Sequence, residues 1–236
     1  MYFPDGLFKV LPYIITSEIN PPLVRKGGIT IPPERIFMYV KDSVRLRIKV
    51  PCGPYEALRT GSGVCLDKSL LLGTIRQANG FKVRYVYSPV ALGDQIYSMV
   101  ELSGGFIEKW YRLTERFIGH IYVEVYINGK WVAGDPALHS AFEAGMGLPI
   151  TRLGENPAAY EYREKIYFHR VPWWVWLAGT SIALTHDMAR KVNARIRKDE
   201  EKGRKILEDM GIEAYDKETR QRYEYMGPKI DPYLPG

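Results

Sequence analysis

Residues 61–70, Gly-Ser-Gly-Val-Cys-Leu-Asp-Lys-Ser-Leu, are the stretch on which the fold of this 236-residue chain depends. Two glycines one residue apart allow a tight turn, because glycine adopts positive φ without steric cost. Apolar residues then recur with a helical period as far as Gly80, which suits the left-handed position after a helix. These apolar residues are Leu66, Leu70, Leu71, Ile75 and Ala78. A strand is expected at 81–87, where apolar and polar residues begin by alternating.

Cys65 falls at the N-terminus of the predicted helix. Free backbone N–H groups and the positive end of the helix dipole stabilise a thiolate there, and the same N–H groups can donate to an oxyanion. A lone cysteine is more commonly a small buried apolar side chain. This stretch alone therefore leaves both interpretations open, a nucleophile and a core residue. Cys52, between Pro51 and Gly53, has no helix after it and is expected to be structural.

Residues 120–135 carry the clearest hairpin signal in the chain. Residues on both sides of Asn128-Gly129 alternate between two faces, and this dipeptide is the preferred type I′ turn. A two-residue loop sets Tyr122 opposite Asp135. His120 and Asp135 therefore share a face as diagonal neighbours, within reach of a hydrogen bond. A register slip of one residue would separate them.

A histidine beside an acid, with a cysteine at a helix start upstream, is typical of a nucleophilic triad. In this interpretation Cys65 attacks, His120 acts as base and acid, and Asp135 orients the imidazole. The other histidines have no acid fixed by local geometry, and we expect them at the surface or at helix caps. These histidines are His139, His169 and His186.

Three segments resemble the blocks of the transglutaminase-like superfamily, over about residues 33–138. Residues 61–65 with the following helix resemble its cysteine block, 120–125 its histidine block and 129–136 its aspartate block. The resemblance implies an α+β, papain-like fold, in which the cysteine helix packs on an antiparallel sheet. It also implies acyl chemistry at an amide through a thioester. The Cys65 N–H is the implied oxyanion donor. Further candidates for oxyanion or substrate contacts are Tyr55, Gly63, Val64, Tyr122 and Trp131.

Three parts are expected along the chain. Residues 1–32 are rich in proline and glycine and are predicted to form an irregular N-terminal wrap. Residues 33–170 would form the catalytic domain, which begins with a helix at Pro33 and continues with a half-buried strand over 44–50. Residues 171–236 are predicted to form a helical extension and tail packed on the body.

Residues 88–119 form a long connection, with a short helix expected at 107–117. A connection of this length is often a lid or wall over a site, and a surface excursion is the alternative.

Residues 171–184 contain three tryptophans in an apolar run of about 14 residues, too short to span a bilayer. The tryptophans could lie at a membrane interface, flank the active-site groove, or pack in the core or between subunits, which is the favoured alternative. Residues 187–205 carry eight basic and four acidic side chains and an apolar stripe, which predict a solvated helix on the body. Peripheral membrane contact through 171–205 is an alternative that we do not favour. We expect no specific binding of a nucleic acid.

Composition limits the remaining choices. The formal charge is +6, and 46% of residues are apolar. Two cysteines cannot form a disulfide framework, which suits a reducing cytoplasm, and five Asn and three Gln hint at a thermophilic source. The motifs for zinc, calcium, dinucleotides and P-loop phosphates are missing from the sequence, so we expect no cofactor and no metal.

These features predict a cysteine-dependent amide hydrolase, a peptidase acting on a peptide or protein substrate. A protein-glutamine acyltransferase or deamidase, and a non-catalytic binding protein with the same fold, are the alternatives.

Overall fold

The structure of the protein is a computed structural model that describes five parts of the chain. These parts are residues 24–25, 28–29, 32–101, 117–177 and 186–226. Most of the predicted N-terminal wrap, the predicted helix at 107–117 apart from Phe117, and the tail beyond 226 lie outside them. The wrap is represented by β1 (Val24–Arg25) and β2 (Gly28–Ile29), which pair antiparallel.

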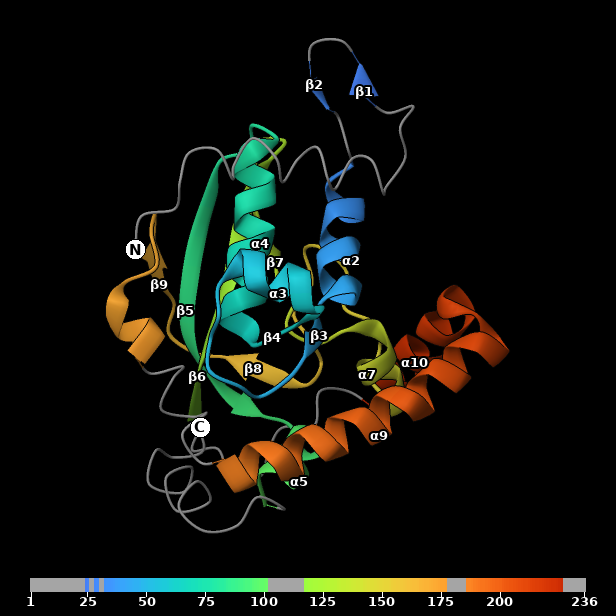
Figure 1. The fold of residues 1–236 in the computed structure, drawn as a ribbon. Helices are drawn as coiled ribbons and strands as arrows, with labels where there is room; N and C mark the ends of the chain where they lie inside the picture. Colours follow the sequence, from blue (N-terminus) through green and yellow to red (C-terminus); the bar gives the residue numbers. More distant parts are fainter. Residues whose placement is uncertain (1–23, 26–27, 30–31, 102–116, 178–185, 227–236) are drawn as a thin grey trace.

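An antiparallel, curled sheet of five strands supports the site (Figure 1). Its strands are β5 (Val83–Leu92), β6 (Phe117–Ile127), β7 (Lys130–Gly134), β8 (Tyr160–Tyr162) and β9 (Ile166–Phe168). The order is β7-β6-β5-β8, and β9 also pairs with β5. β5 runs beyond the predicted end at 87, because β8 and the start of β6 both pair with its second half.

The hairpin of β6 and β7 has the predicted register. Asn128 and Gly129 have φ of 50° and 82°, the positive values that a type I′ turn requires. Tyr126 pairs with Trp131, and the last pair before Asp135 joins Val123 to Gly134. The turn chemistry therefore places His120 and Asp135 at the same end of the hairpin.

The cysteine helix α4 (Cys65–Ala78) packs against β5 and β6, and α2 (Pro33–Ser43) and α3 (Pro54–Thr60) pack against α4 (Figure 1). The predicted start of α4 at Cys65 is confirmed, and so is Gly80 after its end, with φ of 82°.

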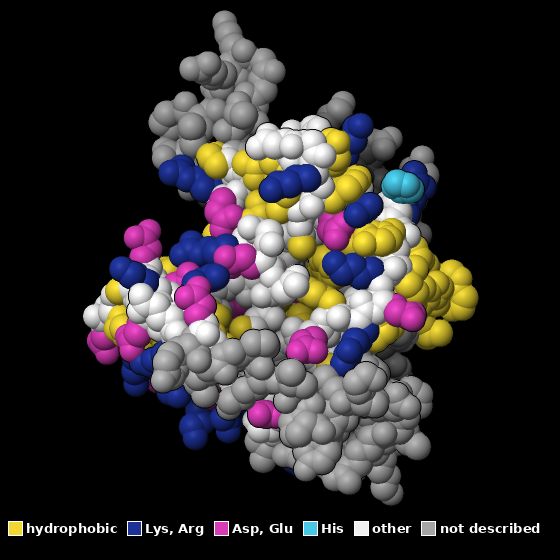
Figure 2. Space-filling view, turned by 180° about the vertical axis from the view of Figure 1, so that it is seen from behind, with side chains coloured by type: hydrophobic (Ala, Val, Ile, Leu, Met, Phe, Trp, Pro, Cys, Tyr) yellow, Lys and Arg dark blue, Asp and Glu magenta, His cyan; other side chains and the backbone are white. Residues whose placement is uncertain are grey.

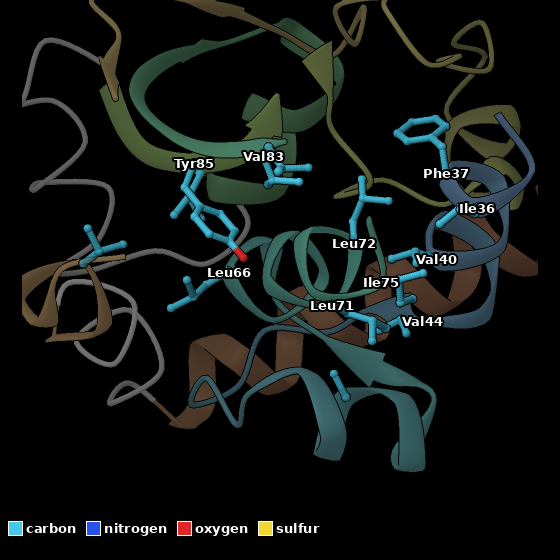
Figure 3. Close-up of a cluster of buried hydrophobic side chains, with 14 residues drawn as sticks. Ile36, Phe37, Val40, Val44, Leu66, Leu71, Leu72, Ile75, Val83 and Tyr85 are labelled. Atoms are coloured by element: carbon cyan, nitrogen blue, oxygen red, sulfur yellow. The ribbon is translucent and has the colours of Figure 1, made fainter. Parts of the chain in front are cut away.

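Figure 3 shows the apolar core between these elements. The labelled side chains are Leu66, Leu71, Leu72, Ile75, Val83, Tyr85, Ile36, Phe37, Val40 and Val44. Burying each side chain of this size contributes about 1.5–3 kcal/mol, so this core fixes α4 on the sheet.

The predicted strand over 44–50 is only partly confirmed. β3 (Arg45–Leu46) pairs in parallel with β4 (Ser62–Gly63), and Val50 is 51% exposed. The Arg47 N–H still donates to the Gly63 carbonyl of β4 at 3.0 Å, but at Ile48 the backbone bonds to a side chain instead. The Ile48 N–H donates to Asn193 Oδ1 at 2.7 Å, and Asn193 Nδ2 donates to the Ile48 carbonyl at 2.8 Å.

Replacing Asn193 with alanine is expected to lower the free energy of unfolding by about 1–3 kcal/mol, because two part-buried backbone groups of Ile48 lose their partner. Urea denaturation measures the change. Asn79→Ala is the control, since Asn79 makes one bond, to Ile75 within its own helix, and should cost less. An Asn193→Ala protein as stable as wild type would contradict this role.

The C-terminal part is helical, as predicted. Residues 171–236 contain the long helices α9 (His186–Met210) and α10 (Ile212–Met226), and α9 runs along α7 (Ser140–Gly145) of the preceding part (Figure 1). A Cβ on Gly203 would collide with the Ala141 carbonyl, and one on Gly145 with the Asp199 carbonyl, so glycine on both helices allows this crossing. α5 (Asp94–Glu101) follows β5. No helix in the described part of the chain has the length and apolar character needed to cross a membrane.

Candidate active site

Cys65 occupies the first position of α4 and is partly exposed. A backbone N–H at this position has no partner within the helix. The Asp67 side chain holds the backbone around the start of this helix. Its Oδ2 accepts the Val64 N–H at 3.0 Å. Its Oδ1 accepts the N–H groups of Cys52 and Gly53 at 2.8 and 2.7 Å. One carboxylate thus ties the 52–53 loop to the start of the cysteine helix.

His120 lies on β6 between the cysteine and the acid and is 7% exposed. Its Nε2 is 2.7 Å from Asp135 Oδ2, and the ring lies close enough to the Cys65 side chain to interact with it electrostatically. Because Nε2 faces Asp135, Nδ1 is the nitrogen left for the thiol. Burial disfavours the imidazolium, but the Asp135 carboxylate and Cys65 outweigh it and raise the pKa of His120 to about 10. A protonated His120 is therefore favoured at neutral pH.

Asp135 follows β7 and is almost fully buried, at 1% exposure. Its Oδ1 accepts the Ala137 N–H at 3.0 Å. Its Oδ2 accepts the hydroxyls of Tyr160 at 2.5 Å and Tyr162 at 2.6 Å, beside His120. Burial alone would raise the pKa of this carboxyl, but His120 and the two hydroxyls lower it to about 2. The structure thus brings the three predicted residues into one chain of contacts.

Sequence reasoning missed three polar side chains around Asp135. Tyr160 and Tyr162 sit on β8, and only their i, i+2 spacing could have signalled a shared face. Lys68, one turn after Cys65, is fully buried and donates to the carbonyls of Ala137 at 3.1 Å and Lys41 at 2.9 Å. Burial lowers the pKa of Lys68 to about 7. Lys68 therefore fixes the position of Ala137, whose N–H donates to Asp135.

The other candidates for oxyanion or substrate contacts occupy several places. Gly63 pairs with Leu46, and the Val64 N–H is engaged by Asp67. Tyr55 is 48% exposed on α3, while Tyr122 is fully buried against the ring of Tyr162 at 4.6 Å.

Trp131 stacks on the guanidinium of Arg84 at 4.3 Å. It lies four residues from Asp135 along β7, about 13 Å on an extended strand. Of this group, Gly63 and Val64 come directly before the cysteine in the chain.

His139 is a correction to the sequence analysis. It precedes α7, as a capping residue would, but it is 3% exposed and so is not at the surface. Its Nδ1 accepts the Leu46 N–H at 3.4 Å, and Nε2 lies 3.5 Å from a Glu200 oxygen. Burial lowers the pKa of His139 to about 4 despite Glu200. His169 is exposed, as expected.

The depressed pKa of His139 makes stability depend on pH. Its pKa is about 4 when folded and about 6.5 when unfolded, so its contribution is present above pH 6.5 and is lost as the pH falls toward 4. The expected loss is of order 2–3 kcal/mol. Urea denaturation at pH 7 and pH 4.5 should show a smaller difference in His139→Gln than in wild type. Equal pH dependence in both proteins would contradict this assignment.

The tryptophan segment packs beside the cysteine. Trp174 contacts Tyr87 and Phe168, with ring centroids 5.2 and 5.8 Å apart, and Trp176 lies over Gly53. Burial and the charge of Cys65 raise the pKa of Tyr87, which places this ring near the thiol. Trp173 stays 75% exposed. Figure 2 shows hydrophobic side chains gathered on one side of the molecule. The exposed large apolar side chains of β9 and of residues 171–177 are Ile166, Tyr167, Trp173, Trp174 and Leu177.

The sheet, the helix-tip cysteine and the His–Asp pair define a papain-like α+β protein with a thiol site. Residues 32–136 match the model of the transglutaminase-like superfamily, a segment that includes Cys65, His120 and Asp135. This segment is therefore similar to the transglutaminase-like superfamily, whose members are usually cysteine-dependent enzymes. No curated protein and no solved structure gave a significant match. Within the described residues, no group of three or more His, Cys, Asp or Glu side chains is arranged to hold a metal ion.

Proposed function

We propose that the protein is a cysteine-dependent amide hydrolase, a peptidase that forms a thioester on Cys65. The observation that carries this proposal is that the His120 ring is hydrogen-bonded to the Asp135 carboxylate and lies close enough to Cys65 for that side chain to raise the pKa of the ring. A nucleophile, a base and an orienting acid in series are the arrangement that amide cleavage through an acyl-enzyme requires. A peptide or protein is the substrate class, and two free cysteines suit a reducing compartment such as the cytoplasm.

In the acylation step, the Cys65 thiolate attacks the amide carbonyl and forms the C–S bond. The Cys65 N–H donates to the oxyanion, and His120 gives its proton to the leaving nitrogen as the C–N bond breaks. In the second step, His120 takes a proton from water, the hydroxide attacks the thioester, and the thiolate leaves as the acid product forms. Asp135 keeps Nδ1 of the ring directed at the sulfur in both steps.

A glutamine peptide with a labelled amine tests whether water or an amine takes the acyl group. We expect a peptide bond to be hydrolysed, with a thioester on Cys65 detected by mass spectrometry in acid-quenched samples. Covalent incorporation of the amine in place of hydrolysis would overturn the peptidase assignment in favour of acyl transfer.

Alkylation by iodoacetamide separates an enzyme from a binding protein that keeps only the fold. Cys52 is an internal control, because burial raises the pKa of its thiol. Cys65 is expected to react faster than Cys52, and His120→Ala should remove the difference. Equal slow labelling of both cysteines would support the binding protein.

A further inference from the structure

The two oxygens of the Asp135 carboxylate have different numbers of hydrogen-bond contacts. Oδ1 accepts one bond, from the Ala137 N–H at 3.0 Å. Oδ2 is contacted by His120 Nε2 at 2.7 Å, by the Tyr160 hydroxyl at 2.5 Å and by the Tyr162 hydroxyl at 2.6 Å. A triad needs only the first of these three contacts. The two phenols therefore call for a separate explanation.

Both phenols come from β8, outside residues 32–136, the segment that matches the superfamily. β8 pairs with the second half of β5, Leu92 opposite Tyr160 and Val90 opposite Tyr162. Residues two apart on a strand face the same way, so one short strand delivers both hydroxyls. Tyr160 is 8% exposed, and its ring centroid is 4.9 Å from that of His120. Its hydroxyl is also 3.3 Å from His120 Nε2.

We propose that Tyr160 and Tyr162 are positioning residues, which act through Asp135 by fixing its carboxylate against the His120 ring and by sharing its negative charge. The proposal rests on the proposed function insofar as His120 is taken to move protons. Its structural part, the control of His120 by two phenols, can be tested whether or not the protein is an enzyme.

Sharing the charge has a direct consequence for His120. Each O–H that donates to Oδ2 stabilises the carboxylate and weakens its attraction for the imidazolium. An acid that held the imidazolium more tightly would slow the release of its proton to a leaving amine. Burial and the Asp135 charge raise the pKa of both phenols well above 10, so they remain donors at neutral pH.

Other groups also face this pair. From α4 come Cys65, which interacts electrostatically with His120, and the Lys68 ammonium, which interacts with Asp135. From β6, Tyr122 stacks near His120 with ring centroids 6.4 Å apart. These groups are unchanged when only a phenol oxygen is removed, so Tyr→Phe substitutions isolate the two bonds to Oδ2.

The test uses Tyr160→Phe, Tyr162→Phe and the double variant, with Tyr215→Phe as control. Tyr215 is also buried, and its hydroxyl donates to the carbonyls of Ala144 and Leu148, away from the site. The control therefore loses a buried hydroxyl without touching Asp135. His120 protonation is read by NMR of ¹⁵N-histidine protein, and kcat and KM are measured on the best peptide substrate.

At pH 10, near the His120 pKa of about 10, about half of the wild-type protein should carry the imidazolium. Removing one phenol hydroxyl should raise the pKa of His120 by about 0.5. The fraction of protein with an imidazolium at pH 10 then becomes roughly three quarters in each single variant and roughly nine tenths in the double variant. Tyr215→Phe should match wild type. With an active enzyme, kcat should fall about tenfold in the double variant while KM changes little.

If the single variants fold and titrate like Tyr215→Phe, the positioning role is overturned even though the enzyme is active. If the pKa of His120 rises in the variants as expected but no amide is cleaved, the proposed function fails and the control of His120 by the phenols stands. If the double variant does not fold, the two single variants decide.

Discussion

Replacing Cys65 with alanine is expected to reduce amide hydrolysis by about 10⁵–10⁶-fold, to the level of background. The sulfur is the atom that would bond the acyl carbon, and alanine has nothing to replace it. Cys65 is only partly buried, and Asp67 holds the start of α4 through backbone N–H groups that do not involve the thiol. We therefore expect the fold to survive the change, with a loss of unfolding free energy near 1 kcal/mol.

Hydrolysis of a chromogenic peptide amide measures the effect, and intact mass spectrometry follows the thioester. Cys52→Ala is the matched control, because it removes the other thiol of the chain while its backbone bond to Asp67 remains. It should hydrolyse the amide at close to the wild-type rate. Full activity in Cys65→Ala, or loss of activity only in Cys52→Ala, would remove the thiol at the helix tip from the mechanism.

The parts of the site that could be predicted are those fixed by short stretches of chain. His120 and Asp135 belong to one hairpin, and the Asn128-Gly129 turn determines which residues oppose each other. The helix at Cys65 follows from local periodicity and a terminal glycine. Their meeting with Cys65 was inferred from the general scheme of nucleophilic triads and from the family resemblance, because nothing local relates a helix tip to a hairpin 55 residues later.

What the sequence did not reveal depends on pairing between distant segments. Tyr160 and Tyr162 reach Asp135 only because β8 returns to the end of β5, about 70 residues away. Ile48 finds its partner in Asn193, on a helix whose docking no local pattern determines. His139 was assigned to the surface or a cap because its acid, Glu200, comes from the same distant helix. In each case the polar group bonds to a residue far away in the sequence, whereas local patterns alone suggested that it faced solvent.

Asp135→Asn is expected to lower kcat by about 10³–10⁴-fold, because asparagine has the shape of the acid without its charge. The hydroxyls of Tyr160 and Tyr162 should turn the amide oxygen toward the Oδ2 position, where it can still accept from His120. The amide NH₂ then faces the Ala137 N–H, so two donors oppose each other. Without the carboxylate, burial alone acts on the imidazolium and the pKa of His120 falls. Less imidazolium then remains at neutral pH beside the Cys65 sulfur, and iodoacetamide labelling of Cys65 should slow together with kcat.

The same variant should reveal the pH window in which the pair stabilises the fold. The pKa of Asp135 is lowered to about 2, so its contribution is present above about pH 3.8 and is lost as the pH falls toward 2. The pKa of His120 is raised to about 10, so its contribution is present below about pH 6.5 and is lost as the pH rises toward 10.

The wild type should therefore exceed Asp135→Asn most between about pH 4 and 6.5, by roughly 3–5 kcal/mol. The difference should narrow on both sides of this window. Urea denaturation from pH 3 to 9.5 measures it, with Asn193→Ala as a control whose deficit should not vary with pH. A deficit in Asp135→Asn that stays constant across this range would mean that the carboxylate contributes packing and hydrogen bonds but no charge interaction with His120. The imidazolium would then lack the counter-ion that the proposed chemistry requires.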